Sequence, residues 1–170
     1  MLDQLQTLSA NFKTTDLLLS LSVADLNADT ATQPSRTTEG PSILWQIEHM
    51  LTHRHTILRL LDAPQLPNPP AKDAPVDLGQ TLDRWNTTAN HLQNALDRCT
   101  PATLEAEARG GPHGETTVFQ LVNFLSWHES YHFGGLGSTR KVLGLTGVAD
   151  LAHTHQQAQK TTAQEVALAS

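Results

Sequence analysis

Hydrophobic residues recur at steps of three and four along several stretches of the chain, which is the spacing of an amphipathic helix. The first stretch, residues 2–26, contains no Pro or Gly and predicts a helix with a break near Ser22. The clearest pattern lies between Leu78 and Cys99, where the apolar positions are alternately four and three residues apart. Such a seam is typical of helices that pack at the shallow angles of a bundle.

Residues typical of helix ends mark the limits of two further predicted helices. Ser42 is a favourable N-cap for a helix predicted over residues 42–62. Thr117 and Gln120 form a capping-box pattern at the start of a helix that reaches about Leu143. Gly144 suits the position that follows the end of this helix. The chain is therefore predicted to contain four long helices.

The segments between these helices are rich in residues that break regular structure. Residues 27–41 are mostly Thr, Asp, Gln, Pro and Gly, and prolines between Pro64 and Pro75 predict a stiff, extended crossover. No alternating strand pattern of useful length occurs. We therefore predict an all-α fold, a four-helix bundle with long crossover connections over residues 1–150, followed by a frayed or loosely docked C-terminal tail, residues 151–170.

Composition narrows the class of protein. The chain has 170 residues, 38% hydrophobic and 16% charged, which fits one folded domain. A net charge of −6 argues against a nucleic-acid partner, and the absence of a long apolar run argues against a membrane span. Cys99 is the single cysteine and can form no intrachain disulfide. The expected location is therefore cytoplasmic.

Histidines are the most informative residues, since there are nine of them. On a helical wheel, His128 and His132 fall inside the apolar face of the last predicted helix, and Glu129 lies at its edge. Side chains four residues apart project from consecutive turns, so these two imidazoles could grip one ion. An isolated core histidine is more often hydrogen-bonded, but two buried imidazoles side by side are costly unless both find a partner.

A third nitrogen ligand could come from the helix predicted over residues 42–62. There His49 and His53 lie together on the flank of the apolar face, and His55 lies on the other side. The wheel does not decide between His49 and His53. Outside a metal site, His53 and His55 are expected at a rim or in solvent.

Two separated stretches resemble the DinB-like (DinB/YfiT) superfamily of four-helix bundles. They are Ser-Ile-Leu-Trp-Gln-Ile-Glu-His at residues 42–49, and His-Glu-Ser-Tyr-His-Phe-Gly at residues 128–134 with the following Arg-Lys-Val-Leu-Gly-Leu at residues 140–145. The resemblance covers roughly residues 2–145. This chain departs from many members in having Gly135 where they have Gln.

The resemblance implies that His49, His128 and His132 bind a divalent metal, with Zn or Ni expected. It selects His49 over His53. Residues 128–132 also fit the HExxH pattern of zinc proteases literally. The resemblance disfavours that reading, because those proteases keep their third ligand downstream of the motif.

Three nitrogen ligands leave open positions on a metal, as in catalytic sites. The resemblance implies a metal-dependent thiol S-transferase that uses a low-molecular-weight thiol and acts on a small-molecule substrate. The thiol has to come from a separate molecule, because Cys99 is expected to be a small residue of the core. One alternative is a hydrolase in which Glu129 serves as acid or base, and another is a non-catalytic, metal-stabilised bundle. The resemblance also implies a homodimer, for which Trp127 offers a suitable face.

Overall fold

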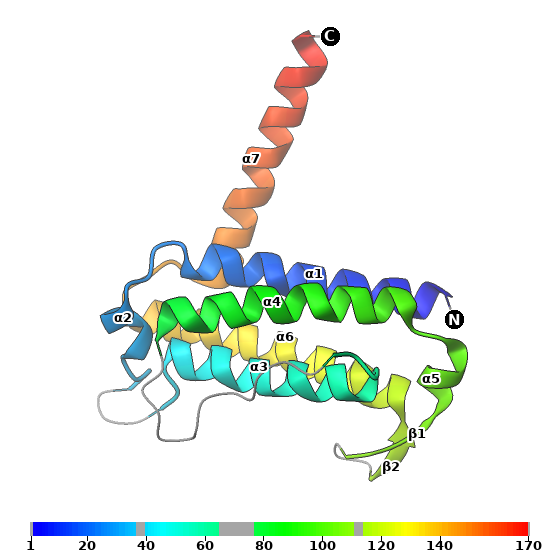
Figure 1. Cartoon of the computed structure of the whole chain (residues 1–170). Coiled ribbons are helices and arrows are strands. Elements are labelled where there is room, and N and C mark those ends of the chain that lie inside the picture. The colour runs from blue at the N-terminus through cyan, green and yellow to red at the C-terminus, as the bar shows by residue number, and fades with distance from the viewer. Residues whose placement is uncertain (1, 37–39, 65–76, 111–113, 170) are drawn as a thin grey trace.

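The computed structural model describes residues 2–36, 40–64, 77–110 and 114–169. Its four long helices are α1 (Leu2–Val23), α3 (Ile43–Leu60), α4 (Leu78–Arg98) and α6 (Val118–Val142). Helix α3 packs against α4 and α6, and α1 packs against the same two helices (Figure 1). The predicted all-α four-helix bundle is thereby confirmed.

The four helices do not alternate in direction along the chain. Helices α1 and α6 run one way, and α3 and α4 run the other way (Figure 1). Because α3 and α4 are parallel, the end of α3 and the start of α4 lie at opposite ends of the bundle. The extended crossover predicted between Pro64 and Pro75 falls on residues 65–76, which lie outside the described residues.

Helix ends follow the signals in the sequence. The Ser42 side chain accepts a hydrogen bond from the Trp45 backbone at the start of α3. Thr117 and Gln120 form both bonds of the capping box at the start of α6. Gly144 has φ +78° after the end of α6, where its missing side chain avoids strain. These contacts supply partners to backbone groups that a helix leaves unpaired at its ends.

The structure adds short elements within the predicted connections. Helix α2 (Ala28–Thr32) follows α1, which ends at Val23 rather than at residue 26, and α5 (Pro101–Glu105) follows α4. Strands β1 (Glu107–Arg109) and β2 (Glu115–Thr117) form an antiparallel pair, in which Ala108 lies opposite Thr116. Three residues per strand are too few for an alternating pattern to show in the sequence.

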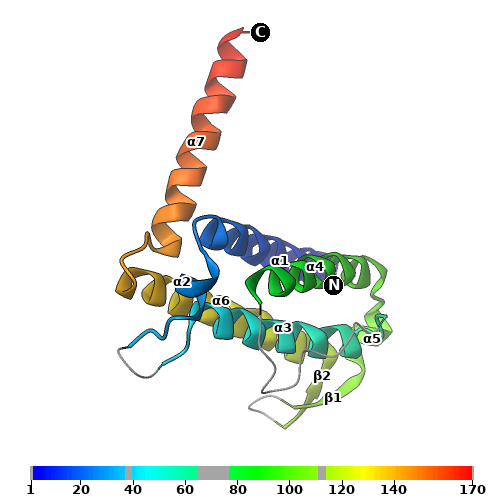
Figure 2. The same ribbon diagram turned by 60° about the vertical axis from the view of Figure 1, so that its left-hand side comes forward.

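The C-terminal segment is one continuous helix, α7 (Val148–Ala169), which leaves the bundle (Figures 1 and 2). Its first turns pack against α1 and α6, whereas residues 156–167 are exposed. A helix surrounded by solvent needs no apolar face, which explains the weak periodicity of this segment. No helix in the described part of the chain is long and apolar enough to cross a membrane.

The core consists of two apolar clusters separated by a polar layer. One cluster includes Leu8 and Ile57, and the other includes Ile47 and Leu136. Between the two clusters, each long helix contributes at least one buried polar side chain. These are Thr15 on α1, Arg54 on α3, Thr88 on α4, and Ser126 and Glu129 on α6.

Candidate metal centre

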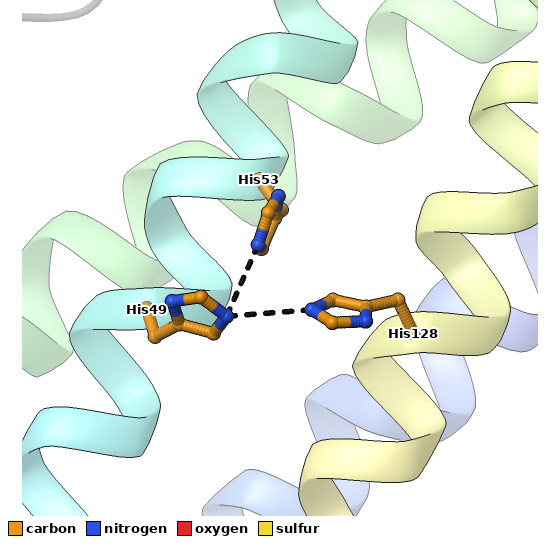
Figure 3. Close-up of side chains that lie close together, drawn as sticks. All are labelled: His49, His53 and His128. Atoms are coloured by element: carbon orange, nitrogen blue, oxygen red, sulfur yellow. Dashed lines mark hydrogen bonds between the residues drawn. The ribbon is translucent and has the colours of Figure 1, made fainter. Parts of the chain in front are cut away.

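Four histidines converge between α3 and α6 at the level of the polar layer. His49 and His53 come from α3, and His128 and His132 come from α6, so each pair spans one helical turn. The Nε2 atom of His49 lies 3.2 Å from that of His53 and 3.3 Å from that of His128. The Nε2 atom of His132 lies 3.0 Å from that of His128. Figure 3 shows His49, His53 and His128 pointing toward one another.

Hydrogen bonds cannot account for all three of these contacts. An imidazole nitrogen has either one proton or one lone pair and so makes one in-plane hydrogen bond. His49 and His128 each place their Nε2 atom beside two others, and at most two of the three contacts can be hydrogen bonds. A cation among the nitrogens would satisfy every lone pair at once.

The geometry fits a tetrahedral metal. Zinc–nitrogen bonds of about 2.0–2.1 Å place two ligand nitrogens of a tetrahedron about 3.3 Å apart. The observed separations of 3.0–3.3 Å match that value. Ligand atoms of His49, His53 and His128 all lie within 4.8 Å of one another. These side chains can therefore hold a divalent ion with little rearrangement.

The predicted ligands His49, His128 and His132 all come together. The structure adds His53, which the wheel left open as an alternative to His49 and the resemblance set aside. The ring centroids of His49 and His132 are 4.5 Å apart, and those of His53 and His128 are 4.7 Å apart. His49 and His128 are therefore central, with one further histidine on either side. The four-residue step from His49 to His53 was the sequence signal for this fourth member. Which histidine completes the ligand set stays a prediction.

A lowered pKa keeps the imidazoles of His49, His53 and His132 in the neutral state that metal binding requires. Burial lowers the pKa of His53 to about 4, helped by repulsion from the neighbouring imidazoles. Burial, helped by repulsion from His49 and His128, lowers the pKa of His132 to about 4 as well. The pKa of His49 is lowered mainly by burial. At neutral pH these side chains therefore offer lone pairs instead of positive charges.

Glu129 lies deeper than the helical wheel places it. Its side chain is 2% exposed, whereas His128 and His132 are only half-buried at the edge of the core. The carboxylate accepts hydrogen bonds from Arg54 Nε at 2.9 Å and Nη2 at 2.6 Å, and another from the Thr15 hydroxyl. The wheel misplaced these residues because α6 packs against both α1 and α3, which widens its buried face.

Arg54 is the centre of the buried polar layer. Burial by itself lowers the pKa of this guanidinium, but Glu129 and Asp16 outweigh burial and raise it. Arg54 Nη1 donates to Asp16 at 2.6 Å, and the guanidinium carbon lies 3.8 Å from the centre of the Trp85 ring. Trp85 Nε1 in turn donates to Asp16 at 2.9 Å. Arg54 and its partners thus hold the Glu129 carboxylate in the interior of the bundle. The acid or base role of Glu129 stays a prediction.

Gly135 lets α3 approach α6 closely beside the histidines. A Cβ atom at this position would lie 2.8 Å from Gln46 Oε1. Gln46 is buried on α3, and its Nε2 donates to the Thr139 hydroxyl on α6 at 3.0 Å. The small residue at position 135 thus makes room for the Gln46 side chain between the two helices.

Cys99 and His55 lie outside the cluster. Cys99 caps α4 and packs against the first apolar cluster, and burial raises the pKa of its thiol. His55 has a pKa lowered by burial and by Arg84. His153 and His155 are on α7, and His113 lies outside the described residues. A partly buried thiol with a raised pKa is a poor nucleophile, in accord with the packing role predicted for Cys99.

Comparisons with known proteins show which family the chain belongs to. The model of the DinB superfamily matches residues 12–136. Among solved structures, the chain is similar to YfiT from Bacillus subtilis, described as a probable metal-dependent hydrolase with an unusual four-helix bundle topology. The TM-score is 0.65 at 14% identity, and the match covers 85% of this chain and 90% of that one. No curated protein sequence matches the chain. The fold and the family match agree with the resemblance, and the chain belongs to the DinB superfamily.

Proposed function

We propose that this protein binds one divalent metal ion through His49, His128 and His132 and uses it to hydrolyse a small-molecule substrate. The proposal rests mainly on the row of four Nε2 atoms, each 3.0–3.3 Å from the next. Hydrogen bonds cannot account for all three of these contacts. Imidazole nitrogens suit zinc and nickel, the expected metals, as well as iron and copper.

Several features of the site support catalysis. All four histidines are half-buried at the edge of the bundle, so a substrate can reach them. A divalent ion in such a site acts as a Lewis acid and lowers the pKa of a water molecule toward about 7. The buried Arg54–Glu129 pair holds α3 and α6 together beside the cluster. The similarity to YfiT, described as a probable metal-dependent hydrolase, supports the reaction class.

Thiol S-transfer with a low-molecular-weight thiol is the second candidate. Neutral histidine ligands leave the full charge of the ion uncompensated, which favours an anionic ligand such as a thiolate. The chain does not bring a thiol to the site, because Cys99 packs at the end of α4 instead. A thiol cosubstrate would therefore have to enter from solution.

Elemental analysis of tag-free protein purified without chelators tests the metal centre. We expect stoichiometric metal in the wild type and in His53→Ala, and loss of the metal in His132→Ala. The reverse result for these two variants would make His53 the third ligand. Absence of metal from the wild type, or metal that persists in His128→Ala, would refute the proposed centre.

Activity assays on the loaded protein separate the two reactions. A hydrolase should cleave 4-nitrophenyl acetate in a metal-dependent manner without added thiol. An S-transferase should instead consume monobromobimane only when a low-molecular-weight thiol is present. His128→Ala is the matched control in both assays, because it removes a central nitrogen of the cluster. Metal-independent turnover in either assay would contradict catalysis at this site.

A further inference from the structure

Exposed aromatic rings border the histidine cluster. Trp45 is 52% exposed, Trp127 is 62% exposed and Tyr131 is 65% exposed. They are the exposed large aromatic side chains of the described residues, and each lies within four residues of a histidine of the cluster. Apolar rings held in solvent beside a candidate catalytic centre mark a ligand-binding surface.

Trp45 and Tyr131 contact the histidines directly, and the three rings come from both α3 and α6. Trp45 on α3 stacks on His49, with ring centroids 5.0 Å apart and an interplanar angle of 8°. Tyr131 on α6 lies 5.4 Å from the ring of His132, and Trp127 stacks on Tyr131 at 6.2 Å. We call Trp45, Trp127 and Tyr131 the aromatic rim.

Charges near the rim are already paired. Glu48, which precedes His49, forms a salt bridge with Arg84 on α4. Glu129, which follows His128, is bound by Arg54 in the interior. The surface beside the histidines therefore presents apolar ring faces to a ligand, and such faces favour stacking with a planar, uncharged group.

We infer that the aromatic rim selects substrates that carry an aromatic group next to the group that approaches the metal. This inference rests on the proposed metal centre. A small planar ligand fits the rim because it can stack on Trp45 or Tyr131 while leaving room at the ion. A second copy seated on the rim would instead cover the face on which the half-buried histidines open to solvent.

Two metal-binding probes that differ only in their side group test the inference. Benzohydroxamate and acetohydroxamate chelate metals through the same atoms, but only the first carries a phenyl ring. We expect the zinc-loaded protein to bind benzohydroxamate about fivefold more tightly, or more, by isothermal titration calorimetry. The preference should fall toward parity in Trp45→Ala and in Tyr131→Ala, and Trp45→Phe should restore part of it.

Val142→Ala is the matched control, because Val142 is 65% exposed at the far end of α6 and should keep the wild-type preference. Equal affinity for both probes would overturn the inference that the aromatic rim selects aromatic substrates. It would not contradict the proposed metal centre. Binding of neither probe by metal-loaded protein would instead refute the open metal centre. A dimer in sedimentation analysis that dissociates in Tyr131→Ala would assign the rim to a second copy and overturn the inference.

Discussion

The buried guanidinium of Arg54 binds the carboxylate of Glu129 through two hydrogen bonds, of 2.9 Å and 2.6 Å. Arg54 follows His53 in the chain, and Glu129 follows His128. The ion pair therefore joins α3 to α6 directly beside the residues that form the candidate metal centre. Two adjacent residues on each helix thus have separate tasks, one inside the core and one at its edge.

Breaking this ion pair should destabilise the fold strongly. Arg54→Met leaves the Glu129 carboxylate buried without its cation, and loss of one partner of a buried pair costs about 3–5 kcal/mol of unfolding free energy. Urea unfolding of the metal-free protein measures the loss. The double variant Arg54→Met/Glu129→Met should be more stable than Arg54→Met, because no lone carboxylate remains. A loss below about 1 kcal/mol in Arg54→Met would contradict a structural role for the pair.

Removing the metal should leave the bundle folded. The two apolar clusters and the Arg54 layer hold the helices without an ion, so dialysis against a chelator should preserve the helical circular dichroism signal. Restoring free metal at 100 times its dissociation constant should add about 2.7 kcal/mol to the unfolding free energy. His128→Ala should show no such gain. Unfolding on chelation would favour the non-catalytic, metal-stabilised bundle.

The stability of the metal-free protein should depend on pH in a defined window. The pKa values of His53 and His132 lie at about 4 in the folded chain, below the ordinary histidine value of 6.5. Between these values the unfolded chain binds protons that the folded chain does not, so stability is lost as the pH falls from 6.5 toward 4.

Urea midpoints measured across this window test the dependence on pH. His53→Ala should show a shallower slope than the wild type, because one of the depressed histidines is gone. Thr52→Ala, an exposed neighbour on α3, controls for substitution in this helix and should keep the wild-type slope. An unchanged slope in His53→Ala would show that His53 does not titrate as its burial predicts.

Shortening the chain after Lys160 should have little effect. The side chains of residues 161–167 are exposed, and the first turns of α7 provide its packing against the bundle. Truncation should change the unfolding free energy by less than about 0.5 kcal/mol, as substitutions on an open surface do. Metal content should also match that of the full chain. A large loss of either would show that the end of α7 contributes to the bundle.

The sequence by itself determined the features that depend on neighbours along one helix. Ser42 and Thr117 mark helix starts because a cap acts on backbone groups within three residues. The four-residue step from His128 to His132 places two imidazoles on one side of α6 wherever that helix packs. The family resemblance added His49 as a ligand, and the structure brings it to the same place.

Only the tertiary structure decided what depends on the rotation of one helix against another. It brought His53 against His128 and turned Glu129 inward to Arg54. The two residues of each contact lie on different helices, about 75 positions apart in the chain. A helical wheel averages hydrophobicity over a whole helix and misses a polar layer that interrupts the apolar face for one turn. The depth of each side chain is set by the helices packed around it, and local sequence does not encode that contact.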